Sequence, residues 1–174
     1  HMGSPISTFT WNQLIDDILI SGPGAGGFDV NGSGFPSAFY YTESVAGDCG
    51  PNGWNFPANV SNSVPNNRGI KFFFRGDRDP GRLIWNNVLG MVAVTLDFTG
   101  TLNQGTQAMG ITYTNNGNSS WDGWNFVPNP YPSAIDWNAA SGWTKTNVSG
   151  TIYVWNAQSG TYATWNGASG TNGM

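Results

Sequence analysis

Clusters of turn-forming residues divide this chain into short pieces. Glycine alone supplies 25 of its 174 residues, and clusters such as GPGAGG (22–27), AGDCGPNG (46–53) and RGDRDPG (75–81) each follow a short apolar run. Glycine, proline, asparagine and aspartate favour turns because of the backbone angles that they accept or impose. A chain interrupted this often leaves little room for long helices, so we expect short strands joined by turns.

The pieces between these clusters have the patterns of strands. In the clearest one, Val92, Val94, Leu96 and Phe98 alternate with small or polar residues over 91–98, as in a strand with one buried face. The other predicted strands, all short and flanked by turn residues, are 15–21, 37–44, 69–74, 110–114, 123–127 and a hairpin of 151–156 with 161–165 joined by AQSG.

These elements predict an all-β protein. Segment 11–18 is a candidate for one short helix, with Thr10 as its cap. About eight to ten antiparallel strands are typical of a β-sandwich, here jelly-roll-like. The start, HMGSP, has the appearance of a cloning remnant. We therefore expect residues 1–4 to be foreign and 5–174 to form a single β-sandwich module excised from a larger protein.

Composition excludes several classes of function. Only 9% of the residues are charged, six are basic and the formal net charge is −4, so no nucleic-acid partner is expected. No apolar run approaches the roughly 20 residues of a membrane span, so membrane insertion is not expected. His1 belongs to the expected remnant and Cys49 is the one cysteine, which removes histidine-based catalysis, a thiolate zinc site and an internal disulfide.

Three runs make the chain recognisable: NNRGIKFFFRGDRDPG (66–81), GWNFVPNPYPSAIDW (123–137) and GTIYVWNAQSGTY (150–162). Together they resemble β-rich modules of large secreted and cell-surface proteins of Bacteroidota, which commonly leave the cell by type IX secretion. The chain departs from those modules at Pro128, where they usually carry glycine. The resemblance implies a secreted or cell-surface location, neighbouring domains in a parent protein, and a context of carbohydrate-active, adhesive or protease domains.

Aromatic residues next to asparagine and aspartate predict a glycan-binding surface. A sugar ring stacks its C–H face on a flat aromatic ring, while its hydroxyls bond to Asn, Asp and backbone groups. Tyr153 and Trp155 share the strand face opposite Ile152 and Val154, so this face is exposed or lines a cleft if the aliphatic face is core. The predicted ligand-binding residues, aromatic or beside aromatics, are Trp121, Asp122, Trp124, Tyr131, Tyr153 and Trp155.

The alternative for each tryptophan is a place in the core. The proline-rich run 128–132 is expected first of all to form a rigid corner, and Trp137 after it is expected in the core. Gly-Trp-Asn-Phe occurs twice, at 53–56 and at 123–126, which is an internal echo too short to establish a duplication.

No cofactor is expected, with calcium as the alternative. In DVNGSG (29–34), Asp29, Asn31 and Ser33 occupy positions 1, 3 and 5 of a calcium loop, but Tyr40 stands at position 12, where a bidentate carboxylate is required. The Arg-Gly-Asp tripeptide at 75–77 is interpreted as part of a charged turn whose side chains pair with one another.

Three functions fit these observations. The first is a non-catalytic polysaccharide-binding module whose partner is a polysaccharide or a cell-surface glycan. It predicts exposed, coplanar Trp or Tyr rings beside Asn and Asp. The second is a structural or adhesive spacer without a small ligand, which predicts that nearly all nine tryptophans are buried. The third is a small glycosidase or polysaccharide lyase, which predicts a deep cleft with a carboxylate pair.

Overall fold

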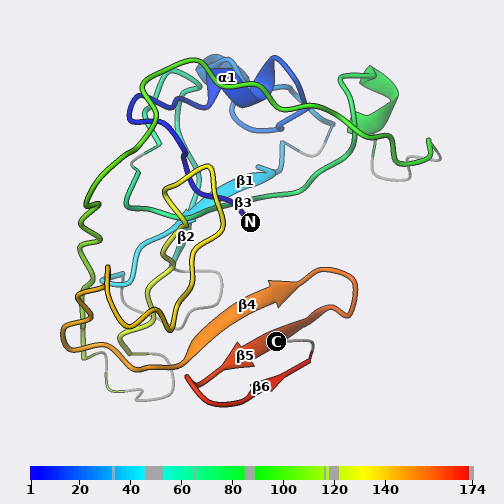
Figure 1. Cartoon of the computed structure of the whole chain (residues 1–174). Coiled ribbons are helices and arrows are strands. Elements are labelled where there is room, and N and C mark those ends of the chain that lie inside the picture. The colour runs from blue at the N-terminus through cyan, green and yellow to red at the C-terminus, as the bar shows by residue number, and fades with distance from the viewer. Residues whose placement is uncertain are drawn as a thin grey trace. The chain divides into compact units, whose positions relative to one another are not determined.

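The computed structural model describes residues 1–32, 34–45, 53–64, 66–84, 89–115, 117 and 122–172 (Figure 1). The chain divides into two compact units, His1–Ser133 and Ala134–Met174. They are called unit 1 and unit 2. No helix in the described part of the chain is long and apolar enough to cross a membrane.

Unit 1 contains a small antiparallel sheet. Its strands are β1 (Ala38–Tyr41), β2 (Trp54–Asn55) and β3 (Ile70–Phe72), in the order β2-β1-β3 (Figure 1). Because side chains alternate across a strand, Ala38 and Ile70 lie on one face, where both are buried. Phe39, Tyr41 and Trp54 lie on the other face together with Lys71.

The core of unit 1 comes mainly from the N-terminal part of the chain. Helix α1 (Asn12–Ile15) carries Leu14 and Ile15 into it. The rest of the cluster, all buried and apolar, is Ile6, Phe9, Trp11, Ile18, Ile20, Phe28, Ala38, Val64 and Ile70. The predicted helix is thus confirmed in a shorter form. The predicted Thr10 cap is wrong, since Trp11 occupies the cap position and makes no side-chain capping bond.

The first residues also pack into unit 1. Met2 pairs with Ile70 beside β3, through hydrogen bonds of 2.9 and 3.0 Å in the two directions. Ser4 is fully buried, and its carbonyl accepts a hydrogen bond from the Asn103 side chain. The expected remnant therefore contributes structure in this chain.

The prediction of eight to ten strands was too high, although the all-β class holds. The described residues form six strands, one short α-helix and two 3₁₀ turns, Gly24–Gly26 and Pro80–Leu83. Strands predicted at 15–21, 91–98, 110–114 and 123–127 are absent from the described residues. Val94, Leu96 and Phe98 nevertheless pack against the core. The alternating apolar residues thus indicate a side turned to the core, although no strand ladder forms there.

Unit 2 contains a meander of three strands, β4 (Ile152–Asn156), β5 (Thr161–Trp165) and β6 (Gly170–Thr171) (Figure 1). The predicted hairpin is confirmed. The two turns of the meander repeat one sequence pattern, Trp-Asn-x-x-Ser-Gly-Thr, at 155–161 and 165–171. Asn156 accepts hydrogen bonds from the backbone of the second and third residues after it, and Asn166 does the same. Each asparagine thereby closes its turn, as asparagine commonly does.

Candidate functional site

Three aromatic side chains lie exposed on one face of the unit 2 sheet. Trp155 pairs with Tyr162 across β4 and β5, and Tyr153 pairs with Thr164. Cross-strand partners share a face, so Tyr153, Trp155 and Tyr162 project to the same side. Their exposed fractions are 46%, 39% and 49%. These three residues are called the aromatic face.

Within the aromatic face, the Tyr162 ring contacts both of the other two rings. Its ring centroid lies 5.1 Å from that of Trp155 and 6.4 Å from that of Tyr153, with interplanar angles of 71° and 82°. The expectation of coplanar rings was therefore wrong for these pairs, because edge-to-face contact is the favoured geometry for neighbouring rings. The three rings of the aromatic face therefore do not form one flat platform.

Hydroxyl groups accompany the rings. Thr164 pairs with Tyr153 on one side and Thr171 on the other, and the two threonine hydroxyls lie 2.6 Å apart. The sequence from 146 to 172 contains no charged residue. The surface thus offers aromatic carbon and neutral hydrogen-bonding groups.

The opposite face of the same sheet is only partly covered. Ala163 is buried, while Ile152 and Trp165 are half-buried. Val154 is 48% exposed. The aliphatic face is therefore not the closed core that we expected opposite an exposed aromatic face. The exposure of the aromatic face thus follows only from the exposed fractions of its three side chains.

The other predicted binding residues lie elsewhere. Trp121 falls outside the described residues. Asp122 is half-buried and Trp124 is 37% exposed, both in unit 1. The Tyr131 hydroxyl donates to the Gly105 carbonyl at 2.7 Å, which ties the proline-rich corner to a neighbouring loop.

Trp137 belongs to a cluster in unit 2, where it is half-buried instead of lying in a core. Its Nε1 donates to the Gly150 carbonyl at 2.9 Å, and its ring meets that of Trp143 edge to face at 5.1 Å. The Lys145 ammonium lies 4.2 Å from the centre of the Trp137 ring and donates to the Trp137 carbonyl. These contacts hold the segment before β4 in place.

The two Gly-Trp-Asn-Phe segments share two local features. Asn55 donates to the Gly53 carbonyl at 3.2 Å, and Asn125 donates to the Gly123 carbonyl at 2.9 Å. A Cβ added at either glycine would overlap a tyrosine ring, that of Tyr41 or Tyr113 respectively. The backbones differ, however, since Trp54–Asn55 forms β2, whereas residues 124–125 are not in a strand and Gly123 has a φ of +77°.

Glu43 follows β1, and its carboxylate is hydrogen-bonded to the second of these segments and to residues 112–114 before it. It is 7% exposed, and its carboxylate accepts four hydrogen bonds. The donors are the Thr112 hydroxyl, the Thr114 hydroxyl and amide, and the Gly123 amide, at 2.6–3.1 Å. Burial alone would raise the pKa of Glu43, but these hydrogen bonds outweigh it and hold the pKa below its usual value. The carboxylate stays ionised with both oxygens occupied.

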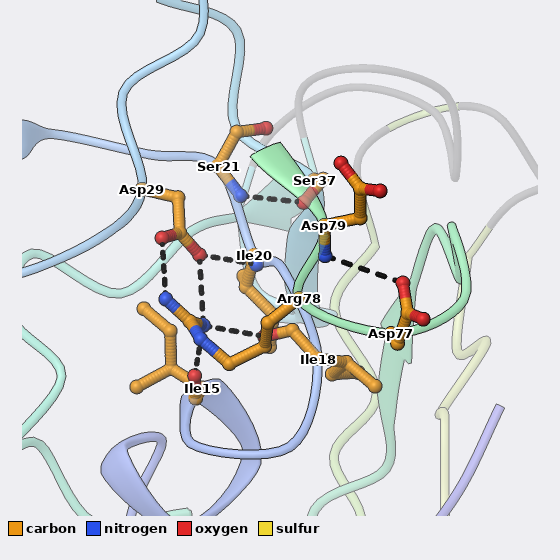
Figure 2. A network of polar contacts seen from close by, with 9 residues as sticks. All are labelled: Ile15, Ile18, Ile20, Ser21, Asp29, Ser37, Asp77, Arg78 and Asp79. Carbon is orange, nitrogen blue, oxygen red and sulfur yellow. Dashed lines mark hydrogen bonds and ion pairs between the residues drawn. The ribbon is translucent and has the colours of Figure 1, made fainter. Parts of the chain in front are cut away.

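The segment considered as an alternative calcium loop is held by an arginine. Figure 2 shows the Arg78 guanidinium between Asp29 and the carbonyls of Ile15 and Ile18. It contacts both Asp29 oxygens, at 2.9 and 3.3 Å, and one of these also accepts from the Ile20 amide at 3.0 Å. Of the other loop residues, Asn31 donates to the Phe35 carbonyl, and Ser33 lies outside the described residues. A calcium ion would have to displace Arg78 from Asp29.

The charged turn is also built differently from the prediction. Asp77 pairs with the buried Arg82 at 2.6 Å, and the Asp79 carboxylate accepts from the Gly81 amide at the start of the 3₁₀ turn. Arg75 lies over the Phe73 ring at 5.0 Å. The Arg-Gly-Asp side chains therefore contact the fold instead of one another.

Tyr162 is the functional candidate that sequence reasoning missed. The AQSG loop was recognised, and a four-residue loop between Asn156 and Thr161 places Tyr162 opposite Trp155. Counting outward from the loop would have added Tyr162 to Tyr153 and Trp155.

Comparison with known proteins places the chain in a family. Neither the curated proteins nor the solved structures give a match. One family, described as "Domain of unknown function (DUF8693)", matches residues 32–168. The match includes both Gly-Trp-Asn-Phe segments and the aromatic face. Since it spans more than half of the 174 residues, the chain belongs to the DUF8693 family.

Proposed function

We propose that this chain is a non-catalytic carbohydrate-binding module of a secreted or cell-surface multidomain protein. In this proposal the module is a jelly-roll-like β-sandwich, and polysaccharide stacks on the aromatic face. The observation that carries the proposal is the exposure of Tyr153, Trp155 and Tyr162 side by side on one sheet face. The resemblance to Bacteroidota modules supports the extracellular location and the type IX secretion context.

The charge distribution favours a neutral polysaccharide. Unit 2 carries two charged residues, Asp136 and Lys145, and neither belongs to its strands. Lys145 lies over the Trp137 ring. An acidic polysaccharide would gain no ionic contact from the strands that carry the aromatic face.

The size of the expected effect follows from stacking. Stacking a base on an aromatic side chain contributes about 1–3 kcal/mol, and a sugar ring presents a comparable contact area. Loss of one ring from the aromatic face should therefore weaken binding by about 5- to 150-fold.

Affinity electrophoresis with neutral plant, algal and fungal polysaccharides tests the proposal. We expect retardation of the wild-type chain, and loss of most of it in Trp155→Ala and Tyr162→Ala. Trp165→Ala is the matched control, because Trp165 lies on the opposite face of the same sheet. Retardation that persists in both aromatic-face variants, or that disappears only in Trp165→Ala, would refute this use of the aromatic face.

Two other functions make different predictions. A structural or adhesive spacer is favoured by the tryptophans that hold the fold, such as Trp11 at 2% exposure and Trp137 in its cluster. It predicts no retardation by any polysaccharide. A glycosidase or lyase would release new reducing ends or unsaturated products. Glu43 is a poor candidate for that chemistry, because all four of its hydrogen bonds are made within the fold.

A further inference from the structure

A polar pocket in unit 1 lies beside the second Gly-Trp-Asn-Phe segment. Its volume is about 130 Å³, below the range of pockets for drug-sized ligands. Tyr41 and Glu43 line it from the end of β1 and the residues after it, and Asn125 and Phe126 line it from the second segment. A site of this size suits a ligand of about one small ring.

Two of the polar side chains in the wall are already saturated. The Glu43 carboxylate accepts four hydrogen bonds. The Asn125 side chain donates to the carbonyls of Thr112 and Gly123 and accepts from the Thr112 amide. These groups give the wall a fixed shape but have little capacity left for a ligand.

Arg68 and Asn67 also line the pocket, and their side chains still have hydrogen-bonding capacity. The Arg68 guanidinium lies 5.1 Å from the centre of the Tyr40 ring, and it makes no ion pair or hydrogen bond with any residue that the structure describes. The Asn67 side chain likewise has no hydrogen-bond partner in the described part of the chain. Arginine has five N–H donors, and stacking on a ring leaves them open. The pocket therefore offers several donors and an amide oxygen.

The remaining features of the pocket select the kind of ligand. Arg68 is positive and Glu43 negative, so their charges offset each other and a strongly charged ligand gains little. Phe126 and Val127 add an apolar wall. We propose that this pocket binds one neutral sugar residue, whose hydroxyl oxygens accept from Arg68 and Asn67 while its C–H face packs on Phe126. The proposal concerns unit 1 alone and does not depend on the aromatic face of unit 2.

Amide chemical shifts of the full chain, titrated with single sugars, test this proposal. The neutral probes are glucose, galactose, mannose and xylose, and the charged probes are glucuronate and glucosamine. We expect a neutral sugar to shift the amides of Thr112, Gly123 and Asn125. Arg68→Ala should weaken this binding by at least about tenfold, the loss expected for one charge-assisted hydrogen bond. Asn67→Ala is the second variant, since it changes an exposed side chain.

Arg75→Ala is the matched control. Arg75 makes the same kind of contact, with its guanidinium 5.0 Å from the centre of the Phe73 ring, but it does not line the pocket. It should leave the sugar-induced shifts unchanged. Shifts produced only by glucuronate would indicate an anion site and overturn the proposal. So would the absence of shifts with every neutral sugar, or shifts that survive both Arg68→Ala and Asn67→Ala. The amides that are followed all lie in unit 1. A negative result would therefore not contradict polysaccharide binding by the aromatic face of unit 2.

Discussion

At the scale of single residues, Glu43 is a buried charge that the fold stabilises locally. A carboxylate removed from water is unfavourable unless hydrogen bonds replace its hydration. Two threonine hydroxyls and two backbone amides supply those bonds. The same bonds join β1 and the residues after it to a segment about 70 to 80 positions later in the chain. Glu43 therefore acts as a cross-link within unit 1.

Glu43→Gln should destabilise the chain by about 2–4 kcal/mol at pH 7. Glutamine replaces one carboxylate oxygen with an NH2 group. Some of the N–H and O–H groups that now donate to Glu43 would then face another donor. Urea denaturation measures the free energy of unfolding. Asp97→Asn, at an exposed carboxylate, is the control and should change it by less than about 0.5 kcal/mol. Equal effects of the two substitutions would show that Glu43 is not a cross-link.

Acid should weaken the fold through the same group. The pKa of Glu43 is lowered from its ordinary value of 4.5, so its contribution to stability is complete above about pH 4.5 and is lost as the pH falls through the folded-state pKa. The hydrogen bond from Arg82 lowers the pKa of Asp77 and gives the same sign. Urea midpoints should be level between about pH 5 and 7 and decrease below about pH 4.5. In Glu43→Gln the decrease of the urea midpoint at low pH should be smaller. A decrease as large as that of the wild type would show that Glu43 does not cause the acid sensitivity.

Asp29 makes a further residue-scale prediction about calcium. Both of its carboxylate oxygens contact Arg78, so calcium would have to replace an ion pair that also holds the Ile15 and Ile18 carbonyls. Neither calcium nor EDTA should change the melting temperature by more than about 2 °C. A rise above about 4 °C on adding calcium, about 1 kcal/mol or more for a chain of this size, would contradict this expectation.

At the scale of elements, segment 91–98 shows how an alternating pattern relates to structure. Alternation arises whenever an extended backbone turns one side to a core, whether or not a neighbouring strand pairs with it. Here Val94, Leu96 and Phe98 pack against the core of unit 1, and Phe98 meets the Phe9 ring edge to face at 5.0 Å. The sequence pattern predicted the packed side correctly for Val94, Leu96 and Phe98. It was wrong for Val92, which is 38% exposed, and wrong about the hydrogen-bonded ladder.

Substitutions in this segment should separate packing from pairing. Phe98→Ala should cost about 2–4 kcal/mol of stability, because it removes a half-buried ring that packs on the core. Met91→Ala should cost less than about 0.5 kcal/mol, since Met91 is 67% exposed. Thermal unfolding of both variants checks the difference. Similar losses for the two would mean that the segment is held by its backbone.

The hairpin in unit 2 and the Glu43 site mark the limits of prediction from sequence. Turn chemistry and alternation are local, so residues 151–165 defined their own strands and nearly the whole aromatic face. The contacts of Glu43 with Thr112 and Gly123 span 69 and 80 positions, and no local pattern encodes such a pairing. The Gly-Trp-Asn-Phe echo was visible in the sequence, but the pocket that Asn125 and Phe126 line was not.

At the scale of the whole molecule, the chain distributes its aromatic clusters over two units. In unit 2, Trp137 joins the residues before β4 through Trp143, Lys145 and the Gly150 carbonyl. In unit 1, Tyr41, Trp54 and Phe126 form another edge-to-face cluster. Each unit can therefore be tested by a substitution within its own cluster.

Trp137→Ala should destabilise unit 2 by about 2–3 kcal/mol, less than the loss for a fully buried tryptophan. Hydrogen exchange should accelerate over residues 134–172 and remain unchanged over the core of unit 1. Trp137→Phe keeps a ring but loses the Nε1 hydrogen bond to Gly150, so it should give a smaller loss. Uniform acceleration across both units would show that the chain unfolds as one cooperative body.

The two lysines of the chain have a practical consequence for measuring any of these activities. Lys71 lies 3.3 Å from the centre of the Trp54 ring, and Lys145 lies 4.2 Å from that of Trp137. Amine-reactive coupling to a sensor surface or a fluorophore would remove both charges and place a bulky group against both indoles. Burial lowers the pKa of the α-amino group of His1, so mildly acidic conditions direct such reagents to the N-terminus. Immobilisation under those conditions preserves both lysine–tryptophan contacts while binding is recorded.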